Sequence, residues 1–149
     1  MNAVARTHRG VVEVALPIRT ISEANARSHW AAKARRVASQ RGPVALRLRG
    51  PLAPFRDAMA VSGHAGAKRP ARGNLAPVIG MSETRQVAVT LTRVAPSNGL
   101  DDDNLRGALK AVRDGVADAL GVDDRDPRVE WKYAQKRGKY GVVVKVEGK

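Results

Sequence analysis

The chain of 149 residues contains no cysteine, which excludes disulfide bonds and zinc sites built on thiolates. Aromatic residues make up only 3% of it, so platforms that stack unpaired bases are poorly supplied. No apolar run approaches the ~20 residues that cross a bilayer. The basic residues near the N-terminus are not followed by the apolar segment of a secretory signal. We therefore expect a cytoplasmic protein that has no membrane partner.

Acidic residues are scarce relative to basic ones. Lys and Arg number 27 against 14 Asp and Glu, which gives a formal net charge of +13. Such an excess predicts attraction to a polyanion and a binding affinity that falls steeply with salt. With so few aromatic residues, a duplex or branched nucleic-acid backbone is a better partner than unpaired bases. A charge that serves only solubility, or a protein that binds the ribosome, is the alternative on composition alone.

The length fits one domain, residues 1–149, and hydrophobic periodicity predicts its elements. β-branched residues at 11–16 predict a first strand. Helical spacing after a capping Ser22 predicts a helix, and the Gly-Pro pair at 42–43 is expected to break or kink it. Residues 44–49 alternate like a strand but also fit a continuation of the helix.

The second half of the chain is more regular than the segment before it. Residues at about 50–85 are rich in Pro and Gly and weakly periodic, which predicts an irregular insertion. A strand is predicted at 86–94, a helix with one apolar stripe at 105–120 that ends at Gly121, and two alternating strands within 129–146 that close as a hairpin. The predicted fold is α/β of the α+β kind, with a small mixed sheet of about four strands packed with two main helices. Its order is strand, helix, insertion, strand, helix, hairpin.

Two short turns concentrate acid at the two ends of the predicted helix. Residues 101–104 read Asp-Asp-Asp-Asn, and three aspartates fall within residues 123–126. Mg²⁺ prefers carboxylate oxygens, usually one or two together with water and a substrate phosphate. In an extended segment Asp101 and Asp103 leave from the same side and converge. The second turn would have to be brought to that point by the fold, which sequence spacing does not show.

A structural role competes with metal binding for these residues. Asp102 or Asp103 would serve as a helix N-cap, with its neighbours complementing the helix dipole. The acidic residues at 123–127 fit an ordinary polar turn. Capping needs a single aspartate, however, and three adjacent carboxylates repel each other unless a cation lies among them. The two clusters together therefore favour a metal site.

These segments carry a resemblance to a known family. Residues 100–105 (Leu-Asp-Asp-Asp-Asn-Leu), an amphipathic helix, residues 121–124 (Gly-Val-Asp-Asp) and the predicted hairpin are similar to the RusA family of Holliday-junction resolvases. In that family a D-x-D-N-L sequence opens a helix and an aspartate pair follows it. The resemblance implies that Asp101, Asp103 and Asp124 are catalytic and bind Mg²⁺, with Mn²⁺ as a possible substitute.

The resemblance extends from residue 86 through the predicted hairpin and, more weakly, over residues 17–25. It departs from the family at one position, because the catalytic lysine expected four residues after the second metal aspartate is Gly107. Lys110 lies on the same helix face as Asp103 and position 107, and it is the candidate replacement for this catalytic role. Arg106 is a second candidate, and a solvated surface lysine is the alternative for Lys110.

The resemblance implies a bacterial or phage-encoded endonuclease that resolves four-way DNA junctions by paired phosphodiester hydrolysis in recombination and repair. It also implies a homodimer, the simplest way to make two symmetric cuts, and no small-molecule cofactor. The candidates for DNA contact are the basic residues of the insertion and of the predicted hairpin turn: Lys68, Arg69, Arg72, Lys136, Arg137 and Lys139. The alternatives are a non-catalytic nucleic-acid-binding protein, whose aspartates serve as caps, and a nuclease for flaps or other branched forms.

Overall fold

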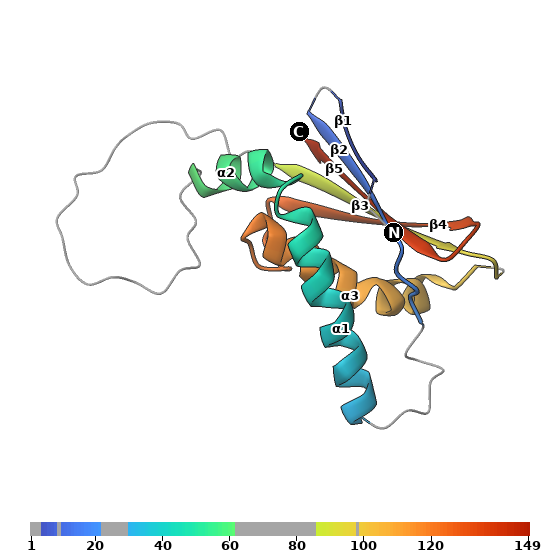
Figure 1. Ribbon diagram of the computed structural model, residues 1–149. Coiled ribbons are helices and arrows are strands. Elements are labelled where there is room, and N and C mark those ends of the chain that lie inside the picture. The colour runs from blue at the N-terminus through green and yellow to red at the C-terminus, as the bar shows by residue number, and fades with distance from the viewer. Residues whose placement is uncertain (1–3, 9, 22–29, 62–85, 98) are drawn as a thin grey trace.

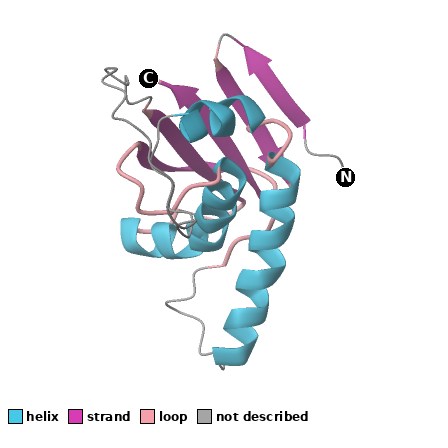
Figure 2. Cartoon of the chain, turned by 90° about the vertical axis from the view of Figure 1, so that its left-hand side faces the viewer, coloured by secondary structure: helices cyan, strands magenta, loops and turns pink. Residues whose placement is uncertain are grey.

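A computed structural model describes residues 4–8, 10–21, 30–61, 86–97 and 99–149 (Figure 1). In chain order the elements are β1 Val4–His8, β2 Val11–Leu16, α1 Trp30–Leu48, α2 Ala53–Val61, β3 Val87–Ala95, α3 Asp102–Leu120, β4 Val129–Arg137 and β5 Gly141–Gly148. The fold is α+β, as predicted. The helices in the described part of the chain lie on one face of a mixed sheet (Figure 2).

The sheet has five strands in the order β1-β2-β5-β3-β4. Its strand pairs are antiparallel except β3 and β4, which run parallel because α3 connects them as a crossover helix. The predicted closing hairpin is wrong, since β3 lies between β4 and β5. The Gly138 N–H donates to the Ala95 carbonyl at 3.0 Å, so the connection passes over the end of β3. Alternation identified both strands but could not identify their neighbours.

The strand β1 is an addition to the predicted sheet. It pairs antiparallel with β2 at the edge of the sheet, with Val4 opposite Ala15 and His8 opposite Val11. Gly10 connects the two strands with φ of 77°, a left-handed conformation that glycine adopts without a steric penalty. The sequence of β1 mixes basic and small residues and lacks the alternation of apolar residues that would predict a strand.

Helix α3 places its apolar stripe against the sheet, as its periodicity predicts. Leu109, Val112 and Val116 are fully buried and belong to the same core as Val89 of β3 and Val144 of β5. Burying each such side chain contributes roughly 1.5–3 kcal/mol. The helix ends at the predicted glycine, residue 121, whose φ of 70° is left-handed and whose N–H reaches the carbonyls of the last turn. The polar face of α3 is thereby fixed toward solvent.

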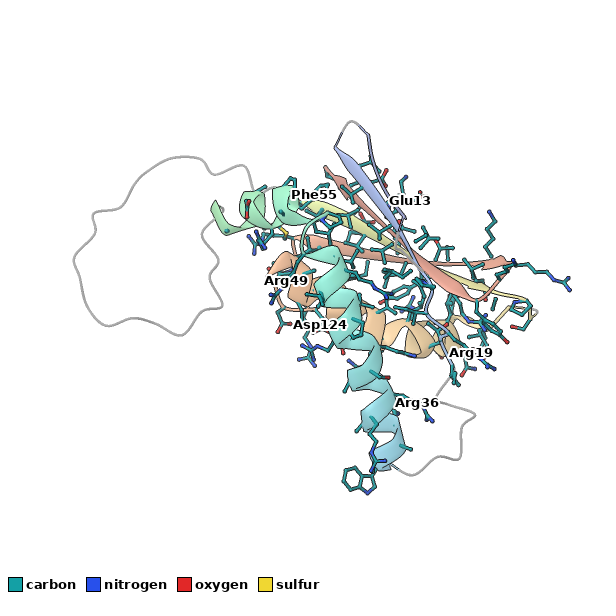
Figure 3. The ribbon with its side chains drawn as sticks, viewed as in Figure 1. Glu13, Arg19, Arg36, Arg49, Phe55 and Asp124 are labelled. Carbon is teal, nitrogen blue, oxygen red and sulfur yellow. The ribbon has the colours of Figure 1, made fainter. Side chains whose placement is uncertain are left out.

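Helix α1 continues through Pro43, so of the predicted break or kink, the break is wrong. Val44 and Leu48 are fully buried while Leu46 is 72% exposed, which is the spacing of a helix and not of a strand. The N-terminal half extends away from the sheet, with Arg36 on it (Figure 3). The predicted Ser22 cap lies outside the described residues.

The contact between α1 and α3 holds the end of α1 in place. A Cβ on Gly115 would lie 2.8 Å from both the Arg41 carbonyl and the Val44 side chain, so the two helices approach closely there. Beside it Arg41 donates two hydrogen bonds to Asp118, at 2.6 and 2.8 Å. The hydrogen bonds and charge of the arginine lower the pKa of Asp118 below its usual range.

Helix α2 lies within the segment predicted to be an irregular insertion, and for residues 53–61 that prediction is wrong. Leu52 before the helix and Met59 within it are buried in the core, with few regularly spaced apolar residues to indicate them in sequence. Residues 62–85 lie outside the described part. Across the described ranges, none of the helices is both long enough and apolar enough to cross a membrane.

Candidate functional site

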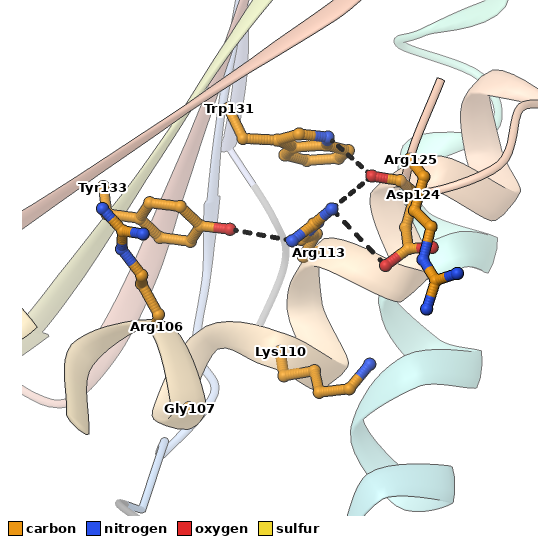
Figure 4. Close-up of a pocket in the computed structure, with 8 residues that line it drawn as sticks. All are labelled: Arg106, Gly107, Lys110, Arg113, Asp124, Arg125, Trp131 and Tyr133. Carbon is orange, nitrogen blue, oxygen red and sulfur yellow. Dashed lines mark hydrogen bonds and ion pairs between the residues drawn. The ribbon is translucent and has the colours of Figure 1, made fainter. Parts of the chain in front are cut away.

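An open pocket of about 570 Å³ lies between α3, β4 and the turn that joins them. It is shown in Figure 4. Its lining residues are Arg106, Gly107, Lys110, Arg113, Asp124, Arg125, Trp131 and Tyr133. Four cationic side chains therefore surround a single lining carboxylate. An excess of positive charge in a concave site attracts anions and concentrates them there.

The pocket follows from two regular patterns in the sequence. Arg106, Lys110 and Arg113 recur at helical spacing and leave α3 on one face, while the opposite face is buried in the core. Trp131 and Tyr133 are two residues apart on β4, so both project from the same side of the sheet. That side is the one covered by the helices, and the two rings form the wall of the pocket facing α3 (Figure 4).

Arg113 is the centre of the hydrogen-bond network in this pocket. Its Nη2 donates to the backbone carbonyl of Asp124 and lies 3.5 Å from the Asp124 carboxylate. Its Nη1 lies 3.5 Å from the Tyr133 hydroxyl, and its guanidinium carbon is 5.1 Å from the Trp131 ring centroid. The Trp131 indole N–H donates to the same Asp124 carbonyl at 3.1 Å. Two side chains from different elements therefore fix the position of Asp124.

The other three cations are less engaged with carboxylates. The Arg106 guanidinium lies over the Tyr133 ring, 5.6 Å from its centroid. Lys110 lies 3.3 Å from Asp114 one helical turn later, with 67% of its side chain exposed. No ion pair is found for the guanidinium of Arg106 or Arg125 with any carboxylate in the described ranges. The pocket thus presents two guanidinium groups, those of Arg106 and Arg125, that are available to an anionic ligand.

The turn behind Asp124 is anchored to the rest of the fold. Asp123 accepts the Arg125 N–H at 2.9 Å, which shapes the turn locally. Asp126 forms a nearly buried ion pair with Arg128 at 2.7 Å, and Arg128 also donates to the Met59 carbonyl of α2 at 3.0 Å. The hydrogen bond from Arg128 to Asp126 raises the pKa of this arginine. The pocket wall is therefore tied to both α2 and β4.

The first acidic cluster, residues 101–103, does not line the pocket. Asp101 is the N-cap of α3 and its carboxylate accepts the Asn104 N–H at 2.9 Å, so the cap is neither Asp102 nor Asp103. Asp102 and Asp103 are exposed in the first turn, where their charge favours the helix dipole. Of the predicted catalytic residues, Lys110 and Asp124 line the pocket, whereas Asp101 and Asp103 do not.

The three predicted metal ligands do not meet within one chain. Among the described residues, no group of three His, Cys, Asp or Glu side chains is placed to hold a metal ion. The reason is the length of α3, whose 19 residues extend about 28 Å at 1.5 Å per residue. The Asp124 turn folds back to Arg113, which is still about 15 Å along the axis from Asp103. A single chain does not fit the three-carboxylate site that the resemblance implies.

The predicted DNA-contacting residues lie outside the pocket or outside the described residues, and four pocket residues were not predicted. Lys136 and Arg137 end β4 and Lys139 follows them, all exposed and outside the pocket. The other predicted DNA-contacting residues, Lys68, Arg69 and Arg72, lie outside the described residues. Sequence reasoning missed the roles of Arg113, Arg125, Trp131 and Tyr133. Arg113 follows Lys110 by three residues on the polar helix face, a signal that was available, whereas nothing in sequence brings Arg125 to that face.

Comparison with known proteins adds a relative but no activity. No known family model matches the chain. A protein of Xylella fastidiosa (strain Temecula1 / ATCC 700964), described as "Uncharacterized protein", is 34% identical over 102 residues. The match covers 68% of this chain and 52% of that protein, so the chain spans about half the length of this relative.

Proposed function

We propose that this chain is a RusA-type, Mg²⁺-dependent endonuclease that resolves Holliday junctions or related branched DNA. The observation that carries the proposal is the pocket in which Arg106, Lys110, Arg113 and Arg125 surround Asp124 in a chain of net charge +13. In this proposal the protein acts in the cytoplasm of a bacterium, encoded by the bacterium or by a phage, in DNA recombination and repair.

Cationic side chains in the pocket support cleavage of a phosphodiester. Negative charge grows on the phosphate during hydrolysis, and a cation already in place stabilises it without reorganisation. Lys110 and Arg106 flank Gly107, the position where the family carries its catalytic lysine. Either side chain is long enough to supply the missing charge from its own position. We assign the role first to Lys110, because Arg106 is engaged with the Tyr133 ring.

DNA affinity is proposed to come from exposed basic residues around this pocket. A phosphate neutralised by Lys or Arg releases counterions, so each contact adds to the affinity and to its salt dependence. The candidates beyond the pocket are those named from the sequence, Lys136, Arg137 and Lys139 with Lys68, Arg69 and Arg72. The stacking of arginines on Tyr133 and Trp131 favours contact with phosphates over stacking with bases.

We propose that a C2 homodimer supplies what one chain does not. Mg²⁺, or Mn²⁺ in its place, supplies a Lewis acid and an activated water when it is bound by carboxylates. Asp101 and Asp103 lie at one end of α3, and Asp124 is held near Arg113 farther along it. Two copies with antiparallel α3 helices would bring carboxylates from different chains together. Such a dimer would contain two equivalent sites, which is what paired symmetric cuts require.

The experiment is cleavage of a synthetic four-way junction, with and without Mg²⁺, beside a linear duplex of the same arms. We expect symmetric nicks in the junction with Mg²⁺ and none in the duplex. Asp103→Asn should abolish nicking and leave binding unchanged or tighter, whereas Asp102→Asn, the matched control, should retain nicking. Nicking by Asp103→Asn at the wild-type rate would exclude this carboxylate from the site.

A non-catalytic nucleic-acid-binding protein is the second candidate. It is favoured by Asp101, whose carboxylate serves as the helix cap, and by glycine at position 107. Thermal unfolding separates the two candidates, because a ligand that binds only the folded state raises the midpoint. A carboxylate site predicts a midpoint raised by Mn²⁺ or Mg²⁺ and lost in Asp103→Asn. Equal midpoints with and without metal would favour the binding protein.

A further inference from the structure

We infer that Arg106, Lys110 and Arg125 form a binding site for one backbone phosphate of a DNA strand. The inference deepens the proposed function, on which it relies only for the identity of the ligand as DNA. Arg125 has no role in the metal site or in the replacement of the family lysine. The site would hold the strand beside Asp124 and would contribute affinity whether or not the bond is cut.

The charges of the pocket favour an anion. Arg106 and Arg125 are exposed, and neither guanidinium forms an ion pair with a carboxylate of the described residues. Lys110 lies 3.3 Å from Asp114, whose side chain is only 13% exposed, but 67% of the lysine side chain is exposed, so its flexible ammonium group remains accessible to a ligand. The carboxylate of Asp124 already faces Arg113 at 3.5 Å. Arg106 and Arg125 therefore remain to neutralise a ligand, with the ammonium group of Lys110 accessible beside them.

The guanidinium of Arg106 and the backbone of Arg125 are held in place before any ligand arrives. The Arg106 guanidinium rests on the Tyr133 ring, at 5.6 Å from its centroid. Arg125 follows Asp124, whose carbonyl accepts hydrogen bonds from Arg113 and Trp131, and its own N–H is bound by Asp123. A side chain or backbone already fixed in its binding position loses less entropy on binding. The pocket is thus arranged in advance for its ligand.

A phosphate fits this arrangement better than other anions or bases. A guanidinium presents parallel N–H donors that match two phosphate oxygens. An arginine lies over one face of each of the Tyr133 and Trp131 rings, so that face is not available to a base. A volume of about 570 Å³ accommodates a nucleotide-sized group. Among phosphate ligands, a polymeric backbone gains additional affinity from a chain of net charge +13.

The test is DNA binding in the absence of Mg²⁺, so that no cleavage complicates it. Arg106→Gln and Arg125→Gln are compared with Arg35→Gln, which removes the same charge from the exposed surface of α1. The probes are the four-way junction and the linear duplex, each titrated at several salt concentrations. We expect each pocket variant to weaken junction binding about tenfold and to reduce the salt slope by about 1. The α1 variant should weaken it less than about twofold.

Conservative variants distinguish the site from a general charge effect. Arg106→Lys and Arg125→Lys keep the charge but lose the paired donors, so they should bind between wild type and the Gln variants. Equal thermal midpoints across the set would show that folding is unchanged. If the Gln variants bind no more weakly than Arg35→Gln, the phosphate site is overturned. Weakened binding in a protein that never nicks junctions with Mg²⁺ would support the site and refute the nuclease.

Discussion

Arg113 binds Asp124 at two points, donating from Nη2 to its backbone carbonyl and lying 3.5 Å from its carboxylate. This contact joins the middle of α3 to the turn that follows it. It determines where the Asp124 carboxylate points. Together with Trp131, whose indole N–H donates to the same carbonyl, Arg113 therefore sets the geometry of this carboxylate.

Replacing Arg113 with lysine should separate geometry from charge. Lysine keeps the positive charge but cannot bind the carbonyl, the carboxylate and the Tyr133 hydroxyl together. We expect the rate of junction nicking to fall about 10²-fold, because small misplacements of reacting groups carry large costs. Junction affinity should change less than about threefold. Single-turnover nicking and metal-free binding measure the two effects, and an equal loss in both would contradict a positioning role.

Adding a side chain at Gly107 tests the proposed role of the pocket. A Cβ at this position meets nothing within 4 Å, so alanine fits without displacing a neighbour and a longer side chain can leave the helix there. Gly107→Ala should raise the free energy of unfolding by roughly 0.5–1 kcal/mol, since glycine inside a helix is unfavourable. Gly107→Lys should raise the nicking rate by restoring the cation where the family carries one. Urea unfolding and nicking rates are the measurements, and a Gly107→Lys protein that nicks more slowly than Gly107→Ala would contradict this account of the pocket.

The ion pair behind the pocket should matter for stability. Arg128 and Asp126 are 2.7 Å apart with only 7% and 12% of their side chains exposed. Arg128→Met removes the ion-pair partner of a poorly hydrated carboxylate, which keeps the hydrogen bond from the residue 128 N–H, and we expect a loss of roughly 3–5 kcal/mol. The control is Lys132→Met, which breaks an exposed pair with Glu130 and should cost less than about 1 kcal/mol. Chemical unfolding compares them, and similar losses would show that burial does not decide the effect.

The ion pair between Arg41 of α1 and Asp118 of α3 should contribute to the stability of the fold in a pH-dependent way. Arg41 lowers the pKa of Asp118, so the pair stabilises the fold fully above the unfolded pKa of about 3.9 and loses this effect as pH falls through the folded pKa. Because both side chains are partly exposed, we expect Asp118→Asn to cost only about 0.5–1 kcal/mol at pH 7. The difference from wild type should shrink below pH ~4. Unfolding curves across pH measure this difference in stability, and a difference that grows in acid would contradict the prediction.

Much of the fold was predictable because its apolar residues are regularly spaced. The stripe of α3 with its terminal glycine and the alternation of β2, β3, β4 and β5 all gave correct elements. Strand neighbours were not predictable, because alternation gives each strand's buried face and says nothing about which strand lies beside it. The continuation of α1 through Pro43 depends on packing against Gly115, which is 72 residues away in sequence. Tertiary contacts there outweigh the local preference of proline.

The candidate site, like the fold, was predictable from the sequence only in part. Gly107 was identified from the family resemblance and Lys110 from the helical spacing that places it on the same face, with Arg106 as the second candidate. The contribution of Arg125 could not be predicted, because it depends on how the turn after α3 folds back. The expectation that three aspartates share one metal rested on family resemblance, and the length of α3 keeps them apart in a single chain. Distance along a helix was available from the sequence and was the neglected signal.

The most direct test of a two-chain nuclease is a mixing experiment on the four-way junction with Mg²⁺. Asp103→Asn and Asp124→Asn are prepared separately and also co-expressed, so that mixed dimers form. We predict that each variant alone makes no nicks. The co-expressed protein should recover about a quarter of the wild-type nicking, because half of the dimers then contain one intact shared site. A co-expressed protein that stays inactive beside an active wild type would contradict the shared site, and a wild type that makes no nicks would contradict the nuclease itself.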